Sequence, residues 1–163
     1  MSVTDELIAY ARNYAKQFDK GDLPLLPRRK VAIVACMDAR LLPARLFGLE
    51  EGDAHVIRNA GGIVTDEEIR SLAISQRLLQ TEEIILVHHT DCGMLKFTDD
   101  EFELALERDT GVKPDWSAQS FPDLDEDVRR SIARIKDSPF IPHKQSVRGF
   151  VYEVETGALR EVS

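Results

Sequence analysis

The sequence has few cysteines and no long apolar run. Only two of its 163 residues are cysteines, Cys36 and Cys92, which excludes the small secreted proteins that several disulfides hold together. No stretch approaches the roughly 20 apolar residues that a transmembrane helix needs. The first residues include Asp5 and Glu6 rather than the apolar region of a signal peptide. We therefore expect a cytoplasmic protein whose thiols stay reduced and are available for metal binding or catalysis.

Positive charge is also scarce. The sequence has 21 Lys and Arg against 29 Asp and Glu, which gives a net charge of -8. The single basic run, at 28–30, is short and precedes a predicted strand. We therefore expect neither a nucleic-acid nor a membrane partner, because the first needs a clustered basic face and the second an apolar segment. The length suits one domain over residues 1–163.

Short apolar runs alternate with helical patterns along the chain. The runs at 31–36, 53–59 and 83–89 predict buried strands, and the residues at 147–162 predict a terminal strand or hairpin. Helices are predicted at 41–49, 65–80, 98–108 and 123–136, two of them beginning at capping boxes of Thr65 and Thr98. Strand, helix, strand in this order indicates right-handed crossovers. The expected fold class is α/β, with a central, mostly parallel sheet flanked by helices.

Residues 1–27 are expected to form an N-terminal helix and a connector. The helix is predicted at 4–18 with Thr4 as its N-cap, and Leu7, Tyr14 and Phe18 lie on one apolar stripe. Glycine and prolines at 21–27 then separate this helix from the first strand. The stripe packs either on its own domain or on a second subunit, and the pattern alone favours neither. We expect the second, an arm that contacts a partner subunit.

Two strand ends carry soft metal ligands. Cys36 ends the first strand, and His89 and Cys92 follow the third strand at His-x-x-Cys spacing. Ligands of open α/β sheets gather at the carboxyl ends of strands, so these three side chains are expected to meet. Two thiolates and one imidazole suit Zn²⁺. With no third cysteine to close the site, the fourth position is left for water or for Asp38, which is typical of a catalytic zinc.

The adjacent His88 needs a separate interpretation. Side chains alternate along a strand, so His88 is expected to face the opposite side of the sheet from His89. It then either supports the site from outside the ligand set or packs in the core.

Two thiolates would neutralise the charge of the zinc. We therefore expect a higher pKa of the zinc-bound water and an activity favoured by alkaline pH.

These residues resemble the β-class carbonic anhydrases. The resemblance is carried by Cys-x-Asp-x-Arg at 36–40, His-x-x-Cys at 89–92, Arg-Asn-Ala-Gly-Gly at 58–62 and the predicted helix over 69–79, and it is closest to the small-chain branch. It implies a parallel sheet core, a homodimer or dimer of dimers, and one Zn²⁺ per chain held by Cys36, His89 and Cys92. The implied reaction is the reversible hydration of CO₂ to bicarbonate and a proton by a zinc-bound hydroxide.

Asp38 and Arg40 are the catalytic residues that the resemblance implies. Asp38 can orient the hydroxide by accepting its hydrogen bond, and Arg40 can hold that carboxylate away from the metal by a charge-assisted bond. If Arg40 releases it, Asp38 can become the fourth metal ligand, which gives an open and a closed state. The alternative for this pair is an ordinary surface ion pair.

The loop after the second strand is expected to line the substrate pocket. Its residues are Asn59, Ala60, Gly61 and Gly62. The paired glycines allow backbone donors and a small apolar wall close to the metal, which suits an uncharged substrate such as CO₂. A simple turn is a compatible interpretation.

Three other functions remain open at this point. Carbonyl sulfide or carbon disulfide hydrolysis would use the same fold and metal. A non-catalytic zinc module for subunit association is disfavoured by the lack of a fourth soft ligand. A redox pair of Cys36 and Cys92 would predict no stoichiometric metal.

Overall fold

A computed structural model describes residues 2–163. Its core is a five-stranded sheet in the order β2-β1-β3-β4-β5. The strands are β1 (Val31–Cys36), β2 (Ala54–Asn59), β3 (Glu83–His89), β4 (Val147–Tyr152) and β5 (Leu159–Val162). The first four strands run parallel to one another, and β5 pairs antiparallel with β4. The predicted α/β fold with a mostly parallel sheet is confirmed.

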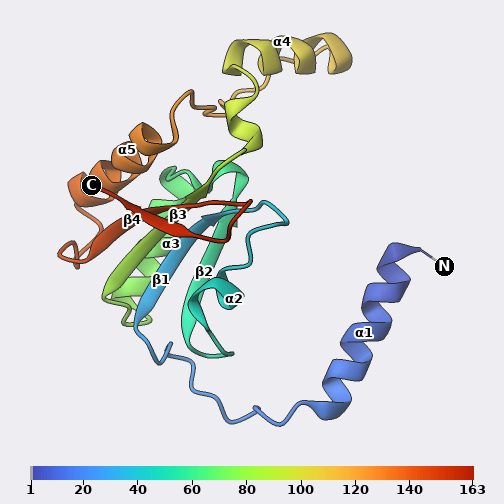
Figure 1. The fold of residues 1–163 in the computed structure, drawn as a ribbon, viewed down its shortest axis with the longest axis vertical. Coiled ribbons are helices and arrows are strands. Elements are labelled where there is room, and N and C mark those ends of the chain that lie inside the picture. The colour runs from blue at the N-terminus through green and yellow to red at the C-terminus, as the bar shows by residue number, and fades with distance from the viewer. Residues whose placement is uncertain (1) are drawn as a thin grey trace.

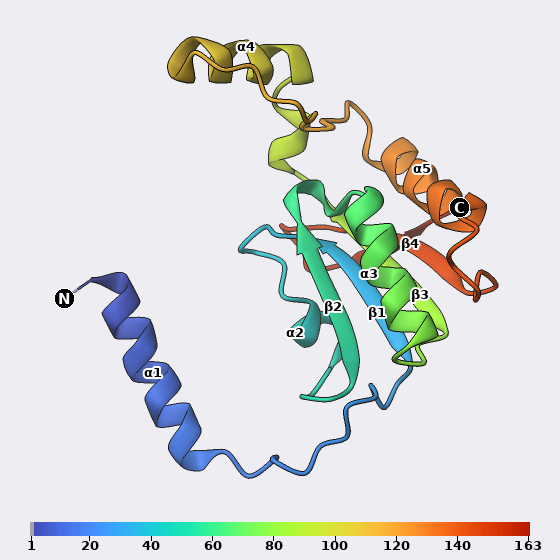
Figure 2. The same cartoon turned by 180° about the vertical axis from the view of Figure 1, so that it is seen from behind.

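Helices cover both faces of this sheet (Figures 1 and 2). The α-helices are α1 (Val3–Gln17), α2 (Pro43–Phe47), α3 (Asp66–Arg77), α4 (Asp99–Thr110) and α5 (Leu124–Asp137), with 3₁₀ turns η1 (Ala60–Gly62) and η2 (Gly93–Leu95). Alternate residues of β1 point to opposite faces of the sheet. Ala32 and Val34 pack in the cluster formed with α3 and α5, whereas Ile33 and Ala35 pack in the cluster beside α2. Burial on both sides explains why β1 is continuously apolar.

The sheet register brings two strand ends together. Ala35 of β1 is paired with Val87 of β3, so Cys36 and the two histidines that end β3 emerge at the same edge. On the other side of β1, Cys36 is paired with Asn59, the last residue of β2. The last residues of β1, β2 and β3 therefore lie at the same edge of the sheet, because these parallel strands are in register.

The N-terminal helix begins earlier than predicted. Ser2, and not Thr4, is the N-cap of α1, so the prediction of Thr4 was wrong. The reason is a reciprocal pair of bonds: the Asp5 amide donates to the Ser2 hydroxyl at 3.2 Å, and the Ser2 amide donates to the Asp5 carboxylate at 2.8 Å. This capping box satisfies two amide groups, which a cap at Thr4 could not do with the same partners.

Two helices project from the body of the molecule. Helix α1 lies apart from the sheet at the end of an extended connector, and α4 projects beyond the opposite end (Figure 1). Neither helix has a buried residue. Helix α1 touches its own body through polar contacts, such as the one from the Tyr14 hydroxyl to Glu51 at 2.9 Å. Across residues 2–163, the structure contains no helix long and apolar enough to cross a membrane.

Candidate metal centre

The structure brings Cys36, His89 and Cys92 together at the carboxyl edge of the sheet. Cys36 Sγ lies 4.0 Å from Cys92 Sγ and 3.1 Å from His89 Nε2. The three ligand atoms all lie within 4.8 Å of one another, and all three residues are buried. Among residues 2–163, this is the one group of three or more such side chains arranged closely enough to hold a metal ion.

The turn from β3 to η2 orients two of these side chains. Asp91 has a φ of 53°, so the chain reverses sharply between His89 and Cys92 and brings both side chains to the same point. The Thr90 carbonyl lies 2.8 Å from His89 Nδ1. That carbonyl accepts the Nδ1 proton and leaves the Nε2 lone pair for a metal, a common arrangement around metal-binding histidines.

Gly62 allows the end of β1 to carry Cys36 in its observed position. Its φ is +69°, and a Cβ at this position would lie 2.7 Å from the Cys36 amide nitrogen. No larger residue fits there without moving the end of β1. Gly62 is therefore needed for close packing of η1 against the Cys36 backbone.

The donor atoms fit a tetrahedral zinc ion. With Zn–S near 2.3 Å and Zn–N near 2.0 Å, two thiolates should be about 3.8 Å apart and a thiolate and imidazole nitrogen about 3.5 Å. The distances of 4.0 and 3.1 Å need only small side-chain adjustments. Both cysteines are free, and their sulfur separation is about twice the length of a disulfide bond.

The pKa values of the three side chains show that they share protons at the point where a cation would bind. The hydrogen bond from the Cys92 thiol, helped by His89, lowers the pKa of Cys36 to about 4, although burial opposes this. The same contact raises the pKa of Cys92, because one shared proton stabilises one thiolate. Burial lowers the pKa of His89, but its bonds to Cys36 and the Thr90 carbonyl outweigh burial and raise it. A cation would replace these protons.

Asp38 and Arg40 lie beside the three ligand atoms. Asp38 Oδ2 is 3.6 Å from His89 Nε2. Arg40 donates to Asp38 through its backbone amide at 2.8 Å, through Nε at 3.0 Å and through Nη2 at 2.9 Å. These bonds hold the pKa of Asp38 well below its usual value. The carboxylate is thus kept ionised and turned toward Arg40, next to the ligand triangle.

Arg58 supports the candidate site through contacts that the sequence did not reveal. Its guanidinium donates to the Cys36 carbonyl at 2.7 Å, the Asp38 carbonyl at 2.8 Å and the Leu41 carbonyl at 2.8 Å. It therefore fixes the segment that carries Cys36, Asp38 and Arg40. Its place in the Arg-Asn-Ala-Gly-Gly motif was the available signal, but three backbone carbonyls leave no trace in a sequence.

The loop expected to line the substrate pocket lies under the site. The Asn59 side-chain amide donates to the Ile63 carbonyl at 2.9 Å, while its buried Oδ1 has no partner among the described residues. Gly61 and Gly62 are buried, and Gly61 faces Met94 and Phe121. Ala60 is exposed. The contribution of these residues to substrate binding stays a prediction.

His88 faces away from the ligand triangle. It is fully buried, its Nε2 lies 2.7 Å from Asp127 Oδ2 of α5, and its ring packs on Phe121 with centroids 5.4 Å apart. Its Nδ1 has no partner within residues 2–163. Of the two interpretations, the structure supports packing in the core, with a polar link to α5.

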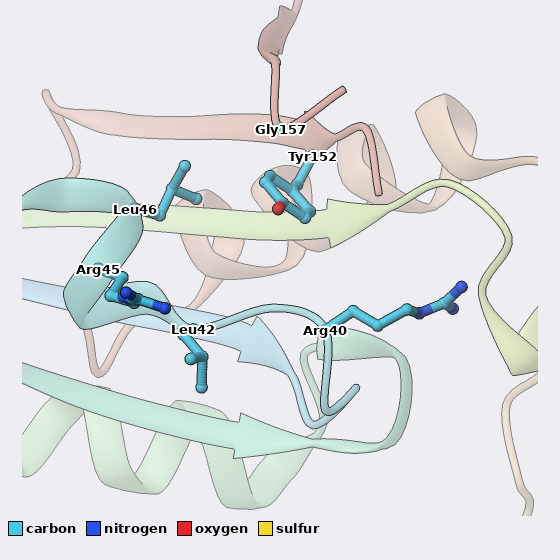
Figure 3. A pocket seen from close by; sticks show the side chains of 6 residues that line it. All are labelled: Arg40, Leu42, Arg45, Leu46, Tyr152 and Gly157. Carbon is cyan, nitrogen blue, oxygen red and sulfur yellow. The ribbon is translucent and has the colours of Figure 1, made fainter. Parts of the chain in front are cut away.

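A pocket of about 240 Å³ opens beside Arg40 (Figure 3). It is lined by Arg40, Leu42, Arg45, Leu46, Tyr152 and Gly157. Arg40 therefore contacts both this pocket and Asp38. None of the three ligand side chains lines it, so it is a neighbour of the candidate metal centre and not its interior.

Comparisons with known proteins agree with this geometry. The family model described as carbonic anhydrase matches residues 31–159. The chain is 59% identical over 163 residues to Beta-carbonic anhydrase 1 of Mycobacterium bovis, covering 100% of this chain and 99% of the relative. It is 35% identical over 182 residues to a carbon disulfide hydrolase of Acidithiobacillus thiooxidans, covering 98% and 90%.

A solved structure gives the same result in three dimensions. The crystal structure of carbonic anhydrase from Streptococcus mutans superposes with a TM-score of 0.94 at 48% identity, covering 100% of this chain and 99% of that one. The match spans the sheet, both strand-end turns and the N-terminal helix. On its family model, its relatives and its fold, the chain belongs to the β-carbonic anhydrase family of enzymes.

Proposed function

We propose that this chain catalyses the zinc-dependent, reversible hydration of carbon dioxide to bicarbonate and a proton. One observation carries the proposal: Cys36, His89 and Cys92 surround one point, and the ionised Asp38 lies beside it without being one of the three. A closed structural zinc site would offer a fourth soft ligand there. The site instead offers an oxygen acceptor held by Arg40.

Cys36, His89 and Cys92 would hold the zinc, one ion per chain. Bound zinc supplies water of lowered pKa as the nucleophile at its fourth position. The Thr90 carbonyl keeps the proton of His89 on Nδ1, so that Nε2 can bind. Arg58 supports the Cys36 end by holding that residue's carbonyl oxygen.

Asp38 would act as the acceptor that orients the nucleophile. Its lowered pKa means that it accepts a proton only in strong acid, so at neutral pH it accepts a hydrogen bond and aims the oxygen lone pair at the carbon of CO₂. Arg40 acts by keeping the carboxylate off the metal. The bond from Arg40 to Asp38 supports the open arrangement, and a closed one, with Asp38 as fourth ligand, requires that bond to break.

The substrate is small, linear and uncharged. A site for it needs an apolar wall and few hydrogen-bond donors, which fits a loop of Asn59, Ala60, Gly61 and Gly62 packed close to the strand ends. Within residues 2–163, Asn59 Oδ1 is the one buried side-chain oxygen without a hydrogen-bond partner, and it lies in this loop.

The test is zinc content together with stopped-flow CO₂ hydration across alkaline pH. We expect about one zinc per chain and activity that rises with pH, because two thiolates reduce the acidity of the bound water. Asp38→Ala should keep the zinc and lose about 10- to 100-fold in kcat/KM, the usual range for a group that orients a reacting atom. A zinc-loaded wild type that does not hydrate CO₂ would exclude the proposal.

Carbon disulfide and carbonyl sulfide are the second candidate substrates. The chain is 35% identical to one named carbon disulfide hydrolase and 36% to another, against 59% to a β-carbonic anhydrase, and the higher identity favours CO₂. Hydrogen sulfide release from either compound, measured on the zinc-loaded protein, separates the two. Faster turnover of carbon disulfide than of CO₂ would reverse the assignment.

We propose that residues 1–27 form an arm onto a second copy of the chain, in a homodimer or a dimer of dimers. Leu7, Tyr14 and Phe18 on α1 are 61%, 55% and 46% exposed, so this apolar stripe is not covered by its own domain. A contiguous apolar face of this kind usually marks an interface. Deleting residues 1–20 should lower the mass of the assembly in solution, and an unchanged mass would contradict the arm.

The cytoplasm is the compartment that suits this chemistry. Two free cysteines 4.0 Å apart would be at risk of oxidation outside it, whereas zinc needs both as thiolates. Fractionation of cells that produce the protein tests this directly, with recovery outside the cytoplasmic fraction as the contrary result.

A further inference from the structure

Arg40 is held from two sides, by one segment from each strand end. Its Nε and Nη2 donate to the two carboxylate oxygens of Asp38, at 3.0 and 2.9 Å. From the other side, its Nη1 donates to Asp91 Oδ2 at 3.0 Å, and its Nη2 to the Asp91 carbonyl at 3.1 Å. Arg40 therefore links the segment that follows β1 to the turn between His89 and Cys92.

Asp91 is anchored in its turn by Lys96. The Lys96 ammonium lies 2.9 Å from Asp91 Oδ1, so each oxygen of this carboxylate meets a different cation. The φ of 53° at Asp91 is in the left-handed region, which Asp and Asn adopt more readily than most residues. The side chains of Asp91 and Lys96 are 56% and 63% exposed, so neither is needed to fill the core.

The two carboxylates do not compete for the same donors. A guanidinium has five N–H groups in a rigid plane, and Asp38 and Asp91 use different ones. A long, half-exposed side chain loses rotamer freedom when it binds one partner, and a second anchor on another segment removes part of that freedom beforehand. The negative charge of Asp91 opposes that of Asp38, but the Arg40 guanidinium bonds to both and water screens the repulsion.

We propose that Asp91 is a positioning residue for the reaction, which acts through Arg40. With Lys96 it fixes the guanidinium in the orientation that holds Asp38 beside the metal centre, and so favours the open arrangement over the closed one. This inference rests on the proposed function, because the closed arrangement needs a metal at the three ligands. The Asp91 side chain bonds to Arg40 and Lys96 and not to the three ligand atoms, so it is a positioning residue and not a catalytic one.

Four variants test the chain of contacts. Asp91→Gly removes the carboxylate and still permits the positive φ, and Asp91→Asn keeps the φ and an oxygen acceptor but removes the charge. Lys96→Met removes the anchor behind Asp91. Glu67→Ala is the matched control, because it breaks another exposed carboxylate–arginine pair, with Arg70 at 2.6 Å on α3.

Three quantities are measured on each zinc-loaded variant: zinc per chain, kcat/KM across pH, and exchange of the Arg40 Nε proton with water by NMR. Asp91→Gly should speed that exchange and lower kcat/KM at neutral pH, each by about 2- to 5-fold, the range of an exposed ion pair. The loss of kcat/KM should be smaller at alkaline pH. The open arrangement releases a proton when its water ionises, so its population rises with pH and depends less on Asp91. Asp91→Asn should be intermediate, Lys96→Met weakest and Glu67→Ala unchanged.

Unchanged proton exchange and an unchanged pH profile in zinc-replete Asp91→Gly would overturn the proposal. So would an equal loss of kcat/KM at every pH, which is what a purely structural role predicts. If Asp91→Gly loses zinc, the same two criteria, proton exchange at Arg40 and the pH profile of kcat/KM, are applied to zinc-replete Asp91→Asn and Lys96→Met. Failure of the proposed function has a different signature, since the wild type would then not hydrate CO₂ although the exchange at Arg40 still responded to Asp91.

Discussion

Cys36, His89 and Cys92 are buried and touch one another, whereas not one residue of α1 or α4 is buried. At the sheet edge, polar atoms find partners from segments more than 50 residues away, as in the bonds from Arg40 to Asp91. The projecting helices rely on local devices, such as the capping boxes of Ser2 and Thr98. The three candidate ligands therefore all come from one chain, while the two helices leave apolar side chains exposed.

The largest effect should come from removing a ligand. Cys92→Ser leaves two soft ligands, so we expect less than about a tenth of a zinc per chain and a loss of activity beyond about 100-fold, more than a change in a supporting residue costs. Zinc analysis and CO₂ hydration measure this. His143→Ala, at an exposed histidine outside the site, is the control and should keep both. Full zinc in Cys92→Ser would show that the centre does not depend on the three buried ligands.

Two glycines allow a direct comparison of the sheet edge with a projecting helix. Gly62→Ala forces a methyl group against the Cys36 amide and adds strain at positive φ, so it should cost about 3 kcal/mol in the free energy of unfolding and weaken zinc binding. Gly111→Ala, at the end of α4, has the same kind of φ but no atom within 4 Å. It should cost only about 1 kcal/mol and leave zinc bound.

Chemical denaturation of both zinc-loaded variants gives these free energies. Equal costs for Gly62→Ala and Gly111→Ala would mean that close packing beneath Cys36 contributes nothing beyond backbone strain.

The smallest effect concerns acid and the base of α4. The Asp99 carboxylate accepts bonds from the Gln119 amide at 3.1 Å and the Ser120 amide at 2.7 Å, and ties the loop after α4 to its first turn. Burial raises its pKa, but these bonds and those from the serine hydroxyls lower it below 3.8 overall. The contribution to stability is therefore fully present well above the unfolded-state pKa and is lost as the pH falls through the lower, folded-state pKa.

Amide hydrogen exchange at Ser120 between pH 5 and pH 2 measures this effect. Exchange relative to an unstructured peptide should increase only at the acid end, and Asp99→Asn should already show increased exchange at pH 5. The zinc content of Asp99→Asn should match the wild type, because the Asp99 carboxylate bonds to residues 117–120 and to none of the three ligand side chains. Acid-independent protection would show that another contact holds the loop.

Much of the site could be predicted because its residues lie at strand ends. The strand at 83–89 was predicted with the bounds that β3 has, and apolar runs ending in Cys36 and His89 indicated a shared edge. The capping box at Thr65 was also predicted correctly, since it depends on neighbours three residues apart. The start of α1 was not, because Ser2 and Asp5 form an equally local box two residues earlier.

Sequence alone determined the fold class, the strand ends and the family, because hydrophobic period and short motifs depend on near neighbours. Only the tertiary structure decided which segments share Arg40, which carbonyls Arg58 holds, and that α1 leaves its apolar stripe exposed. Those contacts join residues 17 to 51 positions apart, or depend on where a connector leads. The free energy of these contacts depends on how closely distant segments of the chain approach each other in the fold, which a pattern of neighbouring residues does not encode.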